Sequence, residues 1–512
     1  MKWFTNGRSR PRYAERALGR RAPVGSADSR SNIDVHRSVA RIVIRNAGTM
    51  NWQSWFDGIL CGREPKNGQS RHAIQKVDWR ISHTINQMED PMVKRAIALG
   101  GGGPAAGLHI GVLEALANAD IEFDVWALSC IGAWVGIVYN QFDGVENKVR
   151  AGKTYQFFKN GVFRDDEGYK RFPINTVFGP DWAGSMSRAL TSFVMDPKNY
   201  LHLWDPSTVV NAFRDSMSLW FPQQKFTIPD DGDINRWILN QVLAPNPFVR
   251  YLTSMMYLSH VTGLSKINYP NSQFMKSINF EALKEPGKPV IFHNAWNLDD
   301  HKLALFSNRP MLQQADKKEY KGPISASSLC ACSALPFIEE TVEIDGVTYC
   351  EGALIDTVNF ESLLEEHHNP PDDTLDEVWV SRIVDSKQVR KPKDLHDALA
   401  NLCQLFAATV GEDDVRIFKY HVQYDEPKWE GIIVEIQVPG HINFKWNHSN
   451  LYNGRELGRA AAEQAIKRYR AHPNLPPHDG PHFINEHPEK NDKEGWQKVQ
   501  DTYRKCRERA DA

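Results

Sequence analysis

The stretch AIALGGGGPAAGLHIGVLEALANADIEFDVWALSCIGAWVG, residues Ala96 to Gly136, decides the fold of this chain. Its pattern of apolar and small residues predicts a strand, a glycine loop, a helix, a second strand and a second helix. Two strand-to-helix turns therefore follow one another, at Gly100 to Gly103 and at Ser129 to Gly132. The first can supply backbone N–H donors and the second can expose a reactive side chain, a pairing that acyl transfer requires.

Length and charge limit the alternatives. A chain of 512 residues predicts two or three domains, or one α/β domain with large insertions. Because 61 Lys and Arg balance 63 Asp and Glu, the chain as a whole does not indicate nucleic acid as a partner. Its apolar runs are shorter than the roughly 18 residues of a membrane span. We therefore expect a soluble, cytoplasmic protein.

The first residues are rich in Arg and lack the apolar centre of a secretory signal. We expect residues 1–45 to form a disordered basic arm and residues 46–93 to form a helical extension. The arm could be an organelle transit peptide, but contact with an anionic surface is favoured, which would place the protein at the periphery of a membrane.

Farther along, alternating strand and helix patterns predict an α/β core with a mostly parallel central sheet, built from residues 94–144 and 289–471. Residues 145–288 are dense in aromatic residues and prolines and predict a large, mainly helical insertion, which either packs on the core or serves as a lid over an acyl-chain groove. The Pro-rich and charged residues 472–512 predict a polar C-terminal tail that adds little to the core.

Seven cysteines at irregular spacings indicate reduced thiols. Cys330, Cys332 and Cys350 lack a C-x-x-C pair and a nearby histidine, so we expect no metal site. We also expect no cofactor.

Cys130 stands at the apex of the second turn, where a helix begins directly after it. The positive end of the helix dipole would lower the pKa of a thiol at this position. A small buried cysteine that packs between strand and helix fits the same local pattern equally well. Both interpretations stay open from this turn alone.

The glycine run favours an anion site, because its backbone N–H groups can point at a phosphate or an oxyanion. A dinucleotide site is the alternative. Gly101, Gly103 and Ala106 approach its glycine spacing, and Glu122 or Asp124 could be its acidic residue.

Three segments, in this order, resemble the patatin-like phospholipase family: LGGGGPAAGLHIGVLEAL, LSCIGAWVG and ISASSLCACSALPFIEETVEIDGVTYCEGALID. The resemblance covers Ile97 to Asp356 and is interrupted by the insertion. It implies a three-layer α/β sandwich that hydrolyses acyl esters with a Ser-Asp dyad. It also implies an oxyanion loop, which matches Gly101, Gly102 and Gly103.

The resemblance places the family's nucleophilic serine at Cys130 and the second glycine of its elbow at Gly132. The dyad aspartate falls on Glu351, followed by Gly352. Asp356 matches a second acidic position, which we expect to order the loop. Both members of the dyad are therefore substituted in this chain.

A Cys130/Glu351 pair keeps a nucleophile and a carboxylate base. Because the reference pKa values of the two groups differ by about four units, either burial must raise the pKa of Glu351 or the helix dipole must lower that of Cys130. We expect a lipid acyl hydrolase that works through an acyl-cysteine and takes an acyl lipid or acyl thioester as substrate. An acyltransferase or acyl-thioesterase, and a non-catalytic acyl-lipid-binding protein, are the alternatives.

Overall fold

The structure, a computed structural model, describes residues 93–142, 146–171, 272–309, 319–360, 375–384, 395–425, 431–440, 443–472 and 481–511, with short pieces between them. All of them belong to the unit Pro91–Ala512. The predicted basic arm, the helical extension up to residue 92 and most of the predicted insertion lie outside the described residues.

A ten-stranded sheet forms the centre of the described chain. Six neighbouring strands run parallel, in the order β13 (His482–Ile484), β12 (Ile432–Gln437), β11 (Glu377–Arg382), β1 (Arg95–Leu99), β2 (Val125–Leu128) and β5 (Val290–Asn297). Two strands pair antiparallel with β5: β10 (Val347–Glu351) and β6 (Lys302–Ser307). β10 pairs antiparallel with β9 (Val342–Ile344), and β6 pairs in parallel with β7 (Glu319–Pro323). The prediction of a mostly parallel central sheet is confirmed.

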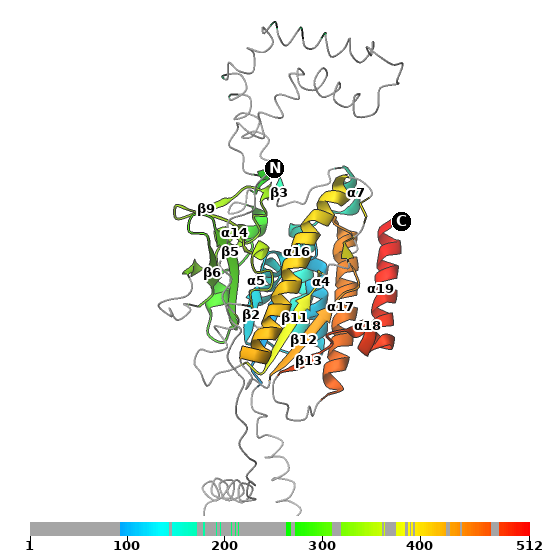
Figure 1. The fold of residues 1–512 in the computed structure, drawn as a ribbon. Helices are drawn as coiled ribbons and strands as arrows, with labels where there is room; N and C mark the ends of the chain where they lie inside the picture. Colours follow the sequence, from blue (N-terminus) through cyan, green and yellow to red (C-terminus); the bar gives the residue numbers. More distant parts are fainter. Residues whose placement is uncertain are drawn as a thin grey trace, which may run out of the picture. The chain divides into compact units, whose positions relative to one another are not determined.

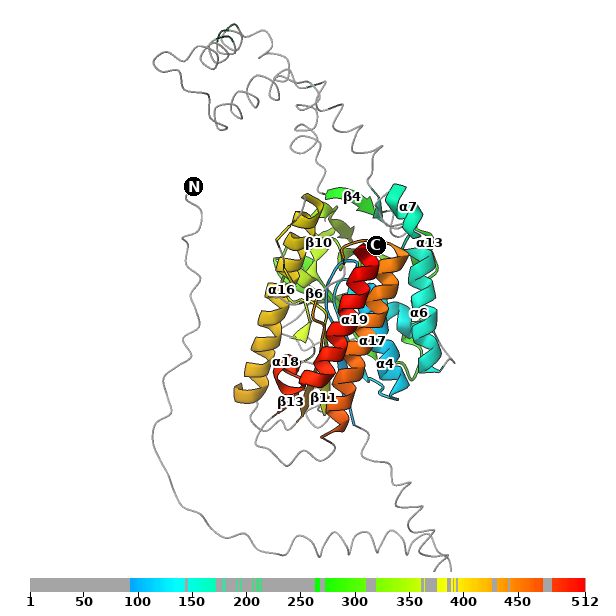
Figure 2. The same cartoon turned by 90° about the vertical axis from the view of Figure 1, so that its right-hand side faces the viewer.

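Helices cover both faces of this sheet, as the two views in Figure 1 and Figure 2 show. On one face α16 (Leu395–Tyr420) packs its apolar side against alternate residues of the central strands, among them Ala98 and Val380. On the other face lie α4 (Ala106–Asn118), α5 (Ile131–Asn140) and α17 (His448–Arg470), packed against residues such as Leu99. The period of two along each strand thus produces the expected three-layer α/β sandwich.

Glycines bring α4 and α17 unusually close together. A Cβ atom at Gly111 would lie 2.0 Å from the carbonyl oxygen of Arg455, and one at Gly458 would lie 2.0 Å from that of Leu108. The two backbones can meet only because both positions lack a side chain. Their contact fixes the helix that follows the glycine loop against the rest of the core.

The C-terminal residues contribute to the core, so the expectation of a tail that adds little to it is wrong for the described part. β13 extends the parallel sheet, and α19 (Lys493–Asp511) packs on α17. The apolar side of α19 consists of residues at helical spacing: Trp496, Val499, Tyr503 and Cys506. Because the rest of the segment is very polar, its composition does not reveal this apolar side. A short helix, α18 (Pro488–Asn491), precedes it.

The remaining elements are short apart from α6 (Asn147–Gly161), which packs on α4 and α5. They are α7 (Asp166–Arg171), β3 (Phe178–Gly179), β4 (Gly263–Ile267), α13 (Gln273–Lys276), η2 (Glu281–Lys284), α14 (Ala326–Ala331), β8 (Phe337–Glu339), η3 (Gly352–Leu354) and the π-helical η5 (His421–Asp425). A mainly helical insertion stays a prediction. Among the described helices, none has the length and apolar character needed to cross a membrane.

Candidate active site

The turn between β2 and α5 holds Cys130 in a conformation that side chains rarely adopt. Its φ of 48° and ψ of −124° place the backbone in the left-handed half of conformational space, where a residue with a side chain is strained. A Cβ atom at Gly132 would lie 2.1 Å from the carbonyl oxygen of Leu99. The first turn of α5 can therefore rest on the end of β1 only with glycine at this position.

Hydrogen bonds tie this turn to neighbouring strands. The backbone N–H of Ser129 donates to the Leu99 carbonyl at 3.0 Å, and its hydroxyl donates to Oδ1 of Asn294 on β5 at 2.9 Å. Nδ2 of Asn294 in turn donates to the carbonyl of Asp356 at 2.8 Å. The turn and the loop after β10 are thereby held together through β5.

Glu351 is the last residue of β10 and lies beside Cys130. Its side chain is buried, and its carboxylate is close enough to the Cys130 thiol for each group to affect the pKa of the other. A Cβ atom at Gly352 would lie 2.8 Å from Oδ1 of Asn294 and 2.9 Å from the backbone nitrogen of Ala295, so glycine lets this loop lie directly on β5. The structure thus brings together the two residues that the motifs singled out.

Burial dominates the titration of both groups. It raises the pKa of Glu351 to about 7, although the neighbouring Cys130 thiol acts in the opposite direction. Burial, followed by the nearby charge of Glu351, raises the pKa of the Cys130 thiol well above its usual value, and the backbone N–H of Ile131 lowers it only partly. The expectation that the helix dipole lowers this pKa is wrong, because desolvation outweighs it. Proton transfer required either a raised pKa of Glu351 or a lowered pKa of the Cys130 thiol. The first of these two conditions is met and the second is not.

Among the loop glycines, Gly101 lies against the pair. A Cβ atom there would lie 3.3 Å from Cβ of Cys130 and 3.9 Å from Oε1 of Glu351. Positions 102 and 103 lie against other groups: a Cβ atom at Gly102 would lie 3.0 Å from Cδ1 of Ile383, and one at Gly103, whose φ is 56°, would lie 2.6 Å from the ring of Phe444.

Glu122 and Asp124 do not fit a dinucleotide site. Both precede β2, at the edge of the sheet opposite the carboxyl ends of the strands, where the glycine loop follows β1. The acidic residue of such a site must lie at the same edge as the glycines.

His109 supports the glycine loop from α4. Its ring is fully buried, with Nε2 2.9 Å from the carbonyl oxygen of Gly100 and Nδ1 3.0 Å from Oγ of Ser381. Burial lowers its pKa to about 4, so the ring is neutral. This arrangement agrees with a packing residue and not with a base.

The loop after Glu351 is ordered by two carboxyl groups, the buried Asp356 and the half-buried Asp414. Oδ1 of Asp356 accepts from the backbone N–H of Asn359 at 2.6 Å, which agrees with its expected role. Asp414 of α16 accepts from the backbone N–H of Thr357 at 2.7 Å. Burial, and next the charge of Asp356, raise the pKa of Asp414 to about 8. No sequence pattern indicated Asp414, because it lies in a helix far from the motifs.

Cys332 is another neighbour that sequence reasoning did not assign to the site. The backbone N–H of Cys130 donates to Sγ of Cys332 at 3.0 Å. Trp134 of α5 anchors the same segment by donating from Nε1 to Oγ of Ser333 at 3.0 Å. Within the described residues, no group of His, Cys, Asp and Glu side chains is arranged to hold a metal ion.

Comparison with known proteins identifies the family. No curated protein matches the chain significantly. Among solved structures, the chain is similar to one described as the crystal structure of VipD from Legionella pneumophila, with 12% identity, a TM-score of 0.30 and coverage of 74% of this chain and 67% of that chain. Residues 97–364 match the patatin-like phospholipase family, and this range includes the glycine loop, Cys130 and Glu351. Since the match spans more than half of the 512 residues, the chain belongs to the patatin-like phospholipase family.

Proposed function

We propose that this protein is a lipid acyl hydrolase that works through a covalent acyl-cysteine at Cys130. Membership of the family supports the hydrolysis of acyl esters as the general activity. The observation that carries the finer proposal is that the Cys130 thiol, at a strained turn, and the Glu351 carboxylate are buried side by side against Gly101. A nucleophile and a base in direct contact are the minimum that covalent acyl transfer needs.

In the first half of the reaction, Glu351 accepts the thiol proton while sulfur attacks the acyl carbonyl. Backbone N–H groups of Gly101 to Gly103 stabilise the negative charge that develops on the carbonyl oxygen. The tetrahedral intermediate collapses to a thioester, and the departing alcohol takes the proton from Glu351. In the second half, Glu351 accepts a proton from water as the water oxygen attacks the thioester carbonyl. The C–S bond then breaks, the acid is released, and Glu351 returns the proton to the sulfur of Cys130.

The raised pKa values favour proton transfer in concert with attack. Burial disfavours a free thiolate at Cys130, so the resting pair holds the proton on sulfur. A carboxylate with a pKa of about 7 is a stronger base than an ordinary glutamate and is still ionised in about half of the molecules at pH 7. The same burial that raises the pKa of the thiol therefore makes its partner a better acceptor.

Acyl transfer and thioester hydrolysis are the second candidate activity. The intermediate is a thioester, which keeps more of its acyl-transfer potential than an oxygen ester would. An acceptor other than water could therefore take the acyl group from Cys130. In a third candidate function the protein binds acyl lipids without turnover.

A turnover assay separates these candidates. Acyl esters and acyl thioesters of varied chain length are offered to the wild type, Cys130→Ala and Glu351→Gln, with and without an alcohol or thiol acceptor. Cys403→Ala is the matched control, because Cys403 is a partly exposed thiol on α16. Release of free acid that requires Cys130 and Glu351 supports the hydrolase, and acyl product on the acceptor supports transfer. Binding of acyl lipids by the wild type without any turnover supports the third function and contradicts the first.

A further inference from the structure

A cavity of about 570 Å³ lies at the amino ends of the parallel strands, away from Cys130. Its walls include Lys94, which precedes β1, Trp126 of β2 and Pro289, which precedes β5. Cys130 follows the opposite end of β2. The volume lies in the range of small-molecule sites, and a ligand here would not contact the proposed nucleophile.

One side of this cavity is apolar. Trp126 is buried and stacks on Tyr139 of α5, with ring centroids 5.5 Å apart. Leu113 and Leu116 of α4 continue the same wall. Aromatic and aliphatic surfaces of this kind bind a ring or a short hydrocarbon chain.

Charged groups surround the apolar wall, and positive charge is in excess. Four cationic side chains line the cavity together with two carboxylates: Lys94, Arg150, Lys288 and Arg309, with Glu122 and Asp124. Both carboxylates already accept hydrogen bonds from the protein, Glu122 from Nδ2 of Asn147 and Asp124 from the backbone N–H of Arg95 at 2.9 Å. The excess positive charge favours an anionic ligand.

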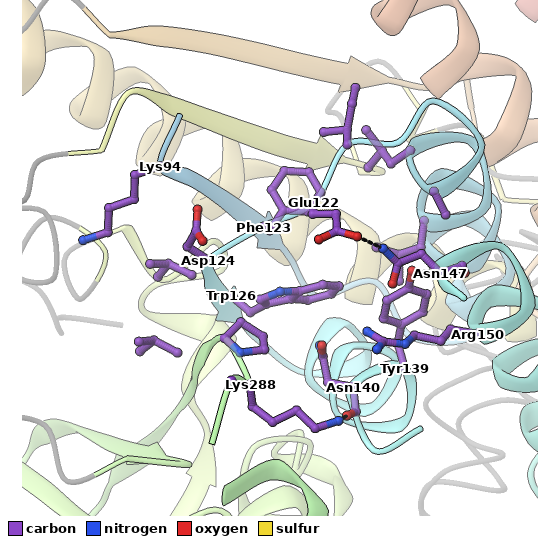
Figure 3. A pocket seen from close by; sticks show the side chains of 18 of the residues that line it. Lys94, Glu122, Phe123, Asp124, Trp126, Tyr139, Asn140, Asn147, Arg150 and Lys288 are labelled. Carbon is purple, nitrogen blue, oxygen red and sulfur yellow. Dashed lines mark hydrogen bonds between the residues drawn. The ribbon is translucent and has the colours of Figure 1, made fainter. Parts of the chain in front are cut away.

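Two donors at the cavity are buried. Lys288 donates from Nζ to the carbonyl of Asn140, at the end of α5, at 2.6 Å. The indole nitrogen of Trp126 has no hydrogen-bond partner within the described part of the chain. Figure 3 shows Trp126 between the hydrogen-bonded pair Glu122 and Asn147 and the contact of Lys288 with Asn140. A buried N–H group without a partner is costly, and an acceptor on a ligand would remove that cost.

We propose that this cavity is a second binding site, for a small organic anion in which a carboxylate or a phosphate monoester is attached to an aromatic or short aliphatic group. The anionic group lies near Arg150, Lys288 and Arg309. The apolar group lies against the leucine side chains of α4 and the stacked rings of Trp126 and Tyr139. The site is separate from the proposed acyl site, so it does not depend on the proposed activity.

Isothermal titration calorimetry of the full chain tests the proposal with phenyl phosphate and phenylacetate as probes and 2-phenylethanol as the uncharged counterpart. We expect one anion per chain to bind, with weaker binding of the alcohol. Arg150→Met and Arg309→Met should each weaken the anion about tenfold or more, because each removes a charged donor. Arg309 is exposed, so its replacement should leave the fold intact. Trp126→Phe keeps an aromatic ring, removes the indole N–H and should also weaken binding.

Lys498→Met is the matched control, since Lys498 is an exposed lysine of α19 outside the cavity wall. Binding of only one of the two anions identifies the preferred acidic group and still supports the site. The proposal is overturned if neither anion binds at millimolar concentration. It is also overturned if binding persists unchanged in both arginine variants, or if Lys498→Met weakens it equally.

Discussion

The thiol of Cys130 and the carboxylate of Glu351 lie side by side inside the protein, although they belong to segments that are far apart in the sequence. Cys130 follows β2 and Glu351 ends β10, and both strands pair with β5. The sheet therefore brings nucleophile and base together, and the glycines beside them allow the close approach.

Glu351→Gln should lower the rate of acyl transfer about 10²- to 10⁴-fold, because the amide cannot accept the thiol proton. In the wild type the rate should rise as pH passes through about 7, where Glu351 loses its proton and becomes a base. The variant should lack this rise. Initial rates between pH 5 and pH 9 measure both effects, with Glu343→Gln, at the exposed position of β9, as the control. An unchanged pH profile in Glu351→Gln would contradict the role of this residue.

Gly132→Ala should destabilise the protein by about 3 kcal/mol or more, because its methyl group would lie 2.1 Å from the Leu99 carbonyl oxygen and force β1 and α5 apart. Gly152→Ala is the matched control. A methyl group in the middle of α6 meets nothing within 4 Å, so this change should stabilise the helix by about 0.5–1 kcal/mol. Urea unfolding measures both free energies. Equal stability of the two variants would refute the packing described for the turn.

Gly101→Ala should lower the acylation rate about 10²-fold while the protein stays folded. The new methyl group would lie 3.3 Å from Cβ of Cys130 and occupy the space beside the pair, where the acyl oxygen must be held. Gly411→Ala is the control, because its nearest contact is an ordinary 3.5 Å to a Thr357 methyl group. Stopped-flow acylation and thermal unfolding separate the two effects. Full activity in Gly101→Ala would exclude this loop from the oxyanion site.

Asp414→Asn should change how stability depends on pH. The pKa of Asp414 is about 8 in the folded protein against 3.8 for an ordinary aspartate, so between these values the folded state keeps a proton that the unfolded state has lost. The contribution of Asp414 to the free energy of unfolding therefore falls as pH rises from about 4 to 8. Asparagine can still accept from the Thr357 N–H and does not ionise. Urea unfolding measures the difference in free energy of unfolding between the wild type and the variant. This difference should shift in favour of the variant between pH 5 and pH 8, and a difference that is the same at both pH values would contradict the prediction.

The parts of the site that sequence could predict are those with strong local constraints. Gly132 and Gly352 lie where another backbone segment comes so close that a Cβ atom would clash with it. Only glycine fits at such a position, so the requirement is visible in the sequence as part of a motif. The hairpin between β9 and β10 was predictable for the same reason, because Asp345 and Gly346 both adopt positive φ angles, 51° and 80°.

Other features arise only when distant segments pack. The raised pKa of the Cys130 thiol comes from burial, which no local turn pattern reports. Asp414 reaches the site from α16, which lies outside the three segments that carry the resemblance. Cys332, directly after α14, lies within one of those segments, but the segment does not indicate that Cys332 accepts from the backbone N–H of Cys130. The core position of α19 was missed because its few apolar residues are diluted by charge.

Intact-mass spectrometry after mixing the protein with a p-nitrophenyl acyl ester tests the central claim most directly. We predict the addition of one acyl group per chain, on Cys130, which hydroxylamine removes as expected for a thioester. Cys403→Ala should still form the adduct and Cys130→Ala should not. An adduct that persists in Cys130→Ala, or no adduct and no turnover with any acyl ester or thioester, would contradict the acyl-cysteine mechanism.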